Sequence, residues 1–251
     1  SVYYKNEDLL KIGRSDFRDM RKNLQIIFQD PYSSLNPRQT VKGLLNEVLT
    51  VKCGYSKAEA AERINELLIQ VGLSPVYANR YPHEFSGGQR QRIAIARALA
   101  LMPEFIVCDE AVSALDVSIQ AQVLNLLNQL QKEYHLTYVF ISHDLSVIKH
   151  ISDRIAIMYL GRIVELCEAE AIYKNPLHPY TKALLSAIPP ESPFEQKERI
   201  VLSGEIPSPI GEQVGCPLAK RCPKCTERCM KEIPQLKEKE NGHKVACFLY
   251  E

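Results

Sequence analysis

The stretch that decides the fold is Phe85-Ser86-Gly87-Gly88-Gln89-Arg90-Gln91-Arg92, followed by Phe105-Ile106-Val107-Cys108-Asp109-Glu110. The first stretch places a serine and two glycines at the start of a predicted helix, where backbone N–H groups and the helix dipole can hold a phosphate. The second is an apolar strand that ends in two adjacent carboxylates, a place for a metal ion and a base. Together they predict nucleotide chemistry, although the printed sequence contains no Gly-x-x-x-x-Gly-Lys-Ser/Thr phosphate loop.

The composition is that of an ordinary globular protein. The chain has 251 residues, of which 45% are hydrophobic and 24% charged, and this suits either one large domain or one domain with a small appendage. The formal net charge of +1 gives no field that would gather nucleic acid or an anionic membrane surface. No apolar run reaches the roughly 18 residues of a membrane span, and residues 1–10 do not resemble a signal peptide. We therefore expect no nucleic-acid partner, and a membrane role only through a partner protein.

The apolar pattern predicts an α/β fold with a parallel sheet covered on both faces by helices. Ser56 and Glu59 predict a capping box at the start of one helix, and Gly72 marks its end. A β-hairpin is expected to turn near Gly161. The predicted strands are 24–28, 105–108, 137–141, 154–159 and 162–166, and the predicted helices are 56–72, 87–101, 118–134, 145–150 and 180–187.

The chain changes character after about Ala169, where prolines become frequent and long elements are not expected. Residues 190–211 are predicted to form an extended linker that leads to a group of cysteines. Five of the eight cysteines lie between Cys216 and Cys247. This distribution indicates a reducing compartment and one local cysteine site rather than a disulfide-stapled secreted protein.

The polar motifs, taken in order, resemble the ATP-binding cassette of ABC transporters. The resemblance extends from about residue 1 to residue 250 and implies a P-loop NTPase-type fold with a helical subdomain at about 40–100. Any one motif alone is weak, whereas the ordered set is highly specific. The residues that carry it are Gln29, Ser86, Gly87, Gly88, Gln89, Asp109, Glu110, Asp116 and His143.

One part of this set acts across a dimer in the resembled family. The stretch Phe85–Gln89 is similar to the signature motif, with Phe85 in place of the usual leucine. In the family, two cassettes face each other head to tail, and the signature motif of one covers the ATP held by the other. The resemblance therefore implies that Ser86, Gly87, Gly88 and Gln89 contact the γ-phosphate on a partner, and that Asp116 is the D-loop aspartate.

The other part of the set would hydrolyse ATP. Asp109 is similar to the aspartate that holds Mg²⁺ through water, and Glu110 to the residue that orients or deprotonates the attacking water. His143 would contact the γ-phosphate, and Gln29 would sense both metal and water. Phosphoryl transfer depends mainly on positioning and charge stabilisation, so single polar residues from separate loops suffice.

The absent phosphate loop is a departure from the family. In the family this loop lies upstream of the glutamine by far more than the 28 residues that precede Gln29 here. We therefore expect a cassette truncated at its N-terminus that binds ATP weakly alone. Two alternatives stay open: a non-hydrolysing partner that completes the ATP site of another subunit, and a cassette ATPase of DNA repair or translation. Members of the latter class usually carry two cassettes or a coiled-coil insert.

Two further regions resemble the ATP-binding subunits of oligopeptide and dipeptide importers, some of whose relatives import nickel. These regions are Phe28–Arg38 and a tail that includes His178–Leu185 and Gly215-Cys216-Pro217. The resemblance implies an ATPase at the cytoplasmic face of a bacterial or archaeal membrane. Its partners would be a second cassette, transmembrane permease subunits and, indirectly, an extracytoplasmic peptide-binding protein. It places the cassette at residues 1–170 and the extension at 171–251.

The cysteine cluster is expected to bind metal. Four thiolates can hold a [4Fe–4S] cluster or a Zn²⁺ ion, and spacing alone does not separate these from cysteines with no ligand role. Members of the importer subfamily carry an iron–sulfur cluster in this region. The subfamily pattern selects Cys216, Cys222, Cys229 and Cys247 as ligands and leaves Cys225 as an extra cysteine.

Overall fold

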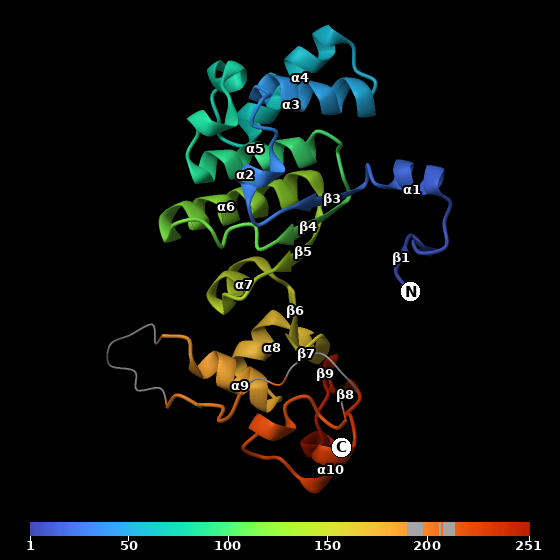
Figure 1. Cartoon of the computed structure of the whole chain (residues 1–251), viewed down its shortest axis with the longest axis vertical. Coiled ribbons are helices and arrows are strands. Elements are labelled where there is room, and N and C mark those ends of the chain that lie inside the picture. Colours follow the sequence, from blue (N-terminus) through green and yellow to red (C-terminus); the bar gives the residue numbers. More distant parts are fainter. Residues whose placement is uncertain (190–197, 206, 208–213) are drawn as a thin grey trace. The chain divides into compact units, whose positions relative to one another are not determined.

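The structure is a computed structural model that describes residues 1–189, 198–205, 207 and 214–251. The chain forms two compact units, Ser1–His143 and Asp144–Glu251, and each is described by itself (Figure 1). Most of the linker predicted at 190–211 lies outside the described residues. None of the described helices combines the length and the apolarity that crossing a bilayer requires.

The first unit is organised around a parallel sheet with the strand order β3-β4-β5. The three predicted strands are confirmed as β3 (Leu24–Ile27), β4 (Phe105–Asp109) and β5 (Thr137–Ile141). Figure 1 shows α5 (Gly87–Leu99) and α6 (Val117–Tyr134) on one side of this sheet. The core on that side includes Ile27, Ile93, Ile95, Ile106, Cys108, Val123 and Leu127, none more than 1% exposed.

The prediction that helices cover both faces of this sheet is wrong for the described residues. Ile26, Val107 and Val139 are paired across the three strands and therefore share the other face. On this face Ile26 and Val139 are 40% and 45% exposed. A continuous apolar run indicates burial on both sides, but in this unit the described helices bury only one set of alternate residues.

A helical region follows β3 and contains α2 (Pro31–Ser34), α3 (Val41–Glu47) and α4 (Lys57–Gln70). The predicted capping box of α4 is confirmed, because the Ser56 side chain accepts from the Glu59 N–H and the Glu59 carboxylate accepts from the Ser56 N–H. Gly72 ends the helix with a positive φ of 71°. Shorter elements are β1 (Tyr3–Tyr4), β2 (Glu7–Asp8), α1 (Arg14–Met20), η1 (Val48–Lys52), η2 (Pro75–Asn79) and η3 (Pro82–Glu84).

The second unit contains an antiparallel sheet with the strand order β6-β7-β9-β8. The predicted hairpin is confirmed as β6 (Arg154–Tyr159) and β7 (Arg162–Glu168), with Gly161 at φ +76° in its turn. Neither β8 (Lys237–Glu240) nor β9 (His243–Val245) was predicted. Because β9 pairs with β7, this sheet includes residues on both sides of position 170, and a domain boundary there stays a prediction.

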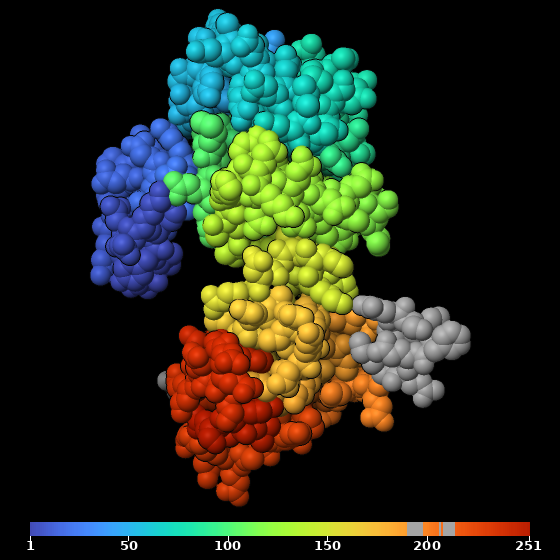
Figure 2. Space-filling model, turned by 180° about the vertical axis from the view of Figure 1, so that it is seen from behind, coloured from blue at the N-terminus to red at the C-terminus, as the bar shows by residue number. Residues whose placement is uncertain are grey.

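Helices complete the second unit around this sheet. Figure 2 shows the red carboxyl-terminal residues lying against the yellow and orange residues of the same unit. The predicted helices near 145–150 and 180–187 are confirmed as α7 and α9. The helices are α7 (Leu145–Ile151), α8 (Ala169–Lys174), α9 (Pro179–Ser186) and α10 (Glu227–Lys231), with the short turns η4 (Ala219–Arg221) and η5 (Phe248–Tyr250).

Candidate functional site

Three of the predicted residues meet at the carboxyl ends of the parallel strands. Gln29 follows β3, Glu110 follows β4 and His143 follows β5, and parallel strands end at the same edge of a sheet. The Gln29 Nε2 donates to Glu110 Oε2 at 2.7 Å, and His143 Nδ1 lies 3.1 Å from Glu110 Oε1. The Glu110 side chain is only 26% exposed, whereas that of His143 is 72% exposed. The carboxylate is therefore held from two sides, next to an opening to solvent.

The backbone at Glu110 is unusual. Glu110 has a φ of +47°, a left-handed conformation that costs on the order of 1–3 kcal/mol for a residue with a side chain. The surrounding hydrogen bonds hold it there. The Glu110 N–H donates to Ile141 O at 3.0 Å, and Ser113 N–H donates to Glu110 O at 3.1 Å.

Ser113 was not predicted as a site residue, although it lies between the predicted residues Glu110 and Asp116. Its hydroxyl donates to the Glu110 carbonyl at 3.0 Å and lies 3.4 Å from Gln29 Nε2. It thereby connects the glutamate backbone to the glutamine side chain. A serine four residues after a strand has no pattern that distinguishes it from an ordinary turn former, so the sequence alone could not identify this contact.

The two predicted aspartates occupy element ends. Asp109 is the last residue of β4 and is paired with Ile141 in β5, which places it beside Glu110. Asp116 is the N-cap of α6, and its carboxylate accepts from the Ile119 N–H at 3.0 Å. A cap of this kind fixes the start of the helix, so Asp116 has a structural task in addition to the role that the resemblance implies.

The serine and glycines of the quoted stretch form the start of α5. Ser86 is the N-cap. Its hydroxyl accepts from the Gln89 N–H, and the Gln89 side-chain oxygen accepts from the Ser86 N–H, so the two residues form a second capping box. An added Cβ on Gly88 would lie 2.2 Å from Ile119 Cγ2, whereas one on Gly87 would meet Leu115 Cδ2 at an ordinary 3.5 Å. Gly88 therefore permits close packing of α5 against α6.

The second unit brings the four predicted cysteines to one place. Cys216, Cys222, Cys229 and Cys247 line a single pocket, together with the buried His178. Among the described residues, no three Cys, His, Asp or Glu side chains are already placed to hold a metal ion. The four thiols thus border a common space without converging on one point.

Hydrogen bonds to sulfur separate these four cysteines from the fifth. Burial raises the pKa of Cys216 to about 11, and a bond from the Leu218 N–H opposes that rise. The same balance of burial against a backbone N–H two residues on applies to the pKa of Cys222 and of Cys247, which are also raised. Cys229 Sγ lies 3.2 Å from Thr226 Oγ1, whereas the Cys225 thiol donates to the Thr226 carbonyl. Donors directed at sulfur favour thiolate, the form that ligates metal.

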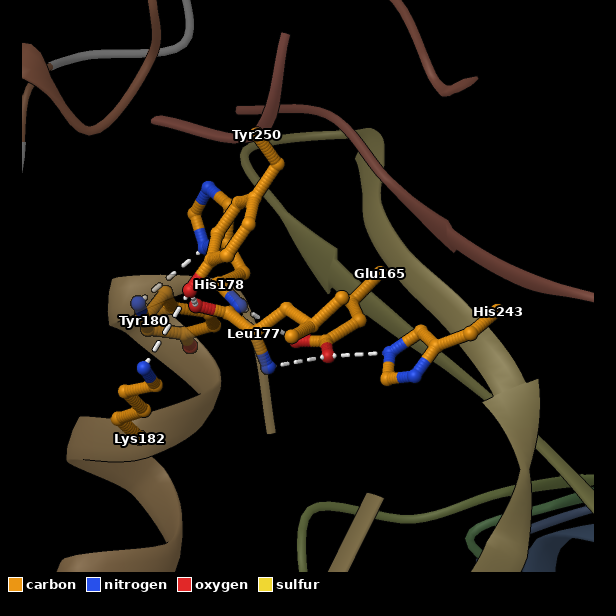
Figure 3. Close-up of polar contacts among 7 residues, drawn as sticks. All are labelled: Glu165, Leu177, His178, Tyr180, Lys182, His243 and Tyr250. Carbon is orange, nitrogen blue, oxygen red and sulfur yellow. Dashed lines mark hydrogen bonds and ion pairs between the residues drawn. The ribbon is translucent and has the colours of Figure 1, made fainter. Parts of the chain in front are cut away.

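A buried carboxylate organises the surroundings of the pocket (Figure 3). Glu165 on β7 is fully buried and accepts from the Leu177 and His178 N–H groups at 2.7 and 2.9 Å. Its Oε1 also lies 2.7 Å from His243 Nε2 on β9. His178 Nδ1 in turn accepts from the Tyr180 N–H at 3.1 Å. Glu165 therefore joins two strands to the start of α9, and sequence reasoning gave no signal for it.

Family profiles match both parts of the chain. The profile described as ABC transporter matches residues 1–113, and the profile of the oligopeptide/dipeptide transporter C-terminal region matches residues 164–229. The chain is 52% identical to the oligopeptide transport ATP-binding protein AppF of Bacillus subtilis, over 99% of this chain and 77% of AppF. It is 51% identical to the dipeptide transport ATP-binding protein DppF of Haemophilus influenzae, over 98% of this chain and 76% of DppF.

Solved structures agree on the fold. CbiO1 from Clostridium perfringens, part of the ABC transporter complex cbiONQ, is similar with a TM-score of 0.62 at 23% identity over 69% of this chain and 67% of CbiO1. The ATP-binding cassette MJ0796, in a post-hydrolysis dimer with ADP and Pi, gives 0.58 at 29% identity over 66% and 72% of the two chains. The fold is therefore the P-loop NTPase fold of ABC cassettes. The chain belongs to the oligopeptide/dipeptide importer family of ABC transporter ATP-binding proteins, which are ATPases.

Proposed function

We propose that this protein hydrolyses ATP to drive the import of oligopeptides or dipeptides. The observation that carries the proposal is the Glu110 carboxylate, which is bonded by Gln29 and His143 where three parallel strands end. The curated relatives named above are described as oligopeptide and dipeptide transport proteins. In this proposal, residues 1–170 form the cassette and residues 171–251 form an importer-type extension.

The side chains divide the work of hydrolysis between them. Asp109 would hold Mg²⁺, which supplies charge neutralisation at the phosphates when it is bound. Glu110 orients the attacking water and accepts its proton, and its partly buried carboxylate is already held by Gln29. The His143 side chain, which is 72% exposed, can exchange its contact with Glu110 for one with the γ-phosphate. The Glu110 backbone, fixed through Ser113, keeps the carboxylate in place while these partners move.

The proposed assembly places a second cassette head to tail with this one. Ser86, Gly87, Gly88 and Gln89 would serve the ATP held by that partner, with N–H groups at the start of α5 directed to phosphate. Transmembrane permease subunits would anchor the dimer at the cytoplasmic face of the membrane, and an extracytoplasmic peptide-binding protein would deliver substrate. A second candidate function is a non-hydrolysing cassette that only completes its partner's site.

Substitution of Glu110 tests the proposal. In the assembled transporter, we expect Glu110→Gln to lower ATP turnover by roughly 10²–10⁴-fold, because it removes a positioned base but keeps size and shape. Binding of a fluorescent ATP analogue should be retained. Glu62→Gln, which changes an exposed carboxylate on α4, is the matched control and should leave turnover unchanged. Wild-type turnover in the Glu110 variant would contradict hydrolysis at this site and favour the second candidate function.

We further propose that Cys216, Cys222, Cys229 and Cys247 hold a [4Fe–4S] cluster, with Zn²⁺ as the alternative. The residues fit such a group because four thiols line one pocket, three of their sulfurs accept a backbone N–H, and the fourth lies 3.2 Å from Thr226 Oγ1. A cluster or ion there would cross-link the segments that carry these cysteines. Its role would be structural, because the pocket belongs to a different unit from Glu110.

Metal analysis of anaerobically purified protein tests this second proposal. About four irons per chain, with broad absorbance in the visible range, are expected for a cubane cluster. Cys229→Ser should lose the metal, and Cys225→Ser, which removes the cysteine without a donor to its sulfur, should keep it. Zinc in place of iron would support a metal site at these cysteines but contradict the iron–sulfur cluster. A metal-free wild type that is as stable as its Cys229 variant would reject the site.

A further inference from the structure

We propose that Cys225 is a thiol-oxidation site that closes a reversible disulfide with Cys222. This inference concerns the one clustered cysteine that lies outside the metal proposal. Cys225 is exposed, whereas the four pocket cysteines are partly buried. A disulfide oxidant in solution therefore reaches Cys225 before it reaches the others. The inference does not depend on peptide import.

A backbone turn brings the Cα atoms of the two cysteines close together. Residues 222–225 form a tight turn in which the Cys225 N–H donates to the Cys222 carbonyl at 3.2 Å. A turn closed in this way brings its first and fourth Cα atoms within about 7 Å. Disulfides bridge Cα separations of about 4.4–6.8 Å, so the bond requires little backbone movement. The two residues between them, Pro223 and Lys224, give the Cys-x-x-Cys spacing found in redox-active dithiols.

Cys229 is the competing partner. The pKa of Cys225 is raised by partial burial, by the neighbouring thiols Cys229 and Cys222, and by a side-chain hydrogen bond with Cys229, so all three sulfur atoms share one neighbourhood. Cys229, however, also makes two other contacts that a disulfide with Cys225 would disturb. Its sulfur contacts Thr226 Oγ1 at 3.2 Å, and its carbonyl accepts from the Cys216 N–H at 2.7 Å. Bonding to Cys222 leaves both of these contacts intact.

The chemistry is a two-step thiol–disulfide exchange with glutathione disulfide. The Cys225 thiolate attacks one sulfur of the oxidant, the oxidant's S–S bond breaks, and one glutathione leaves. The Cys222 thiolate then attacks the Cys225 sulfur of the mixed disulfide and releases a second glutathione. The two thiol protons end on the two glutathione molecules. The protein loses two electrons and the oxidant gains them.

The bond would control the metal pocket. Cys222 is one of the four cysteines that line it, and a disulfide sulfur is no longer a thiolate ligand. Oxidation therefore removes one of four candidate ligands, and reduction returns it. Formation of the Cys222–Cys225 disulfide thereby makes metal uptake dependent on the ratio of glutathione disulfide to glutathione.

Tryptic mapping identifies the bond. The full chain, freed of metal with a chelator and of reductant, is treated with glutathione disulfide, alkylated and digested. Cleavage after Arg221, Lys224 and Arg228 separates the three cysteines. The expected product is the 222–224 peptide linked to the 225–228 peptide. A link between the 225–228 and 229–231 peptides, or Cys225 remaining glutathionylated or unmodified, would overturn the proposal.

Two variants sharpen the test. Cys222→Ser should leave Cys225 trapped as the mixed disulfide with glutathione, because the attacking thiol is gone. Cys225→Ser should leave the 222–224 peptide reduced under the same treatment. If Cys222 becomes oxidised as readily in the Cys225 variant as in wild type, Cys225 is not the entry point and the proposal fails.

Discussion

Two glutamates show how the same side chain takes different tasks in this protein. Glu110 is held through side chains that can rotate away, Gln29 and His143, and it borders solvent. Glu165 is held by two backbone N–H groups and by the nearly buried His243. Exchangeable partners suit a carboxylate that must receive water during a reaction. Fixed backbone donors suit a carboxylate that holds segments together.

The close approach at Gly88 leads to a prediction about stability. Gly88→Ala should lower the free energy of unfolding by about 1–3 kcal/mol, because the added methyl would overlap Ile119 and force α5 away from α6. Gly87→Ala is the matched control, since its added carbon meets Leu115 at ordinary contact distance. Urea denaturation of both variants measures the difference. Equal midpoints for the two variants would show that α5 and α6 are not in close contact at Gly88.

The elements that the sequence predicted are those whose signals are local. The capping box of α4, the start of α5 and the turn at Gly161 each follow from residues within a few positions of one another. The strands β8 and β9 could not be predicted in this way. β8 reads Lys-Glu-Lys-Glu, and all four of its residues are exposed. It forms because β9 pairs with it and with β7. That partnership is set by tertiary structure, which overrides local propensity.

For the candidate site too, the residues with a local motif were predicted, and the contacts that depend on tertiary structure were not. The order of motifs identified Gln29, Glu110 and His143, and the structure brings these three into contact. The contacts of Ser113 and Glu165 depend on a left-handed backbone and on a long-range strand pairing. Neither feature leaves a periodic or motif signal, so both required coordinates.

The cap of α4 allows a prediction at the level of one helix. Ser56→Ala should lower the free energy of unfolding by about 1 kcal/mol, because the Glu59 N–H loses its acceptor. Ser74→Ala is the control, since Ser74 precedes η2 without a side-chain capping bond. Thermal unfolding followed by circular dichroism compares them. A Ser74 variant that loses as much stability as the Ser56 variant would contradict the capping account.

At the scale of the whole molecule, the second unit should lose stability in mild acid. Burial lowers the pKa of His178 from 6.5 to about 4, against an opposing effect of the Glu165 charge. Above pH 6.5 the imidazole is neutral in both states and contributes nothing to the pH dependence. As the pH falls from 6.5 to 4, His178 becomes protonated in the unfolded chain but stays neutral in the folded one, so the free energy of unfolding declines. The full effect is about 3 kcal/mol.

Urea titrations between pH 7 and pH 4 measure this decline. His178→Asn is the informative variant, because an asparagine oxygen can still accept from the Tyr180 N–H at the start of α9 but does not titrate. It should flatten the decline, whatever its stability at neutral pH. An equally steep decline in this variant would assign the acid sensitivity to other groups.

The Glu165 contact also has a consequence for biosynthesis. His243, the histidine that approaches this carboxylate, is 78 positions further along the chain, and β9 pairs beside it. A ribosome adds residues in order, so Glu165 leaves the exit tunnel long before its partner has been made. The first unit, which ends at His143, can fold during this interval. The second unit cannot complete this contact until His243 has been translated, and this delay is when chaperones would be needed most.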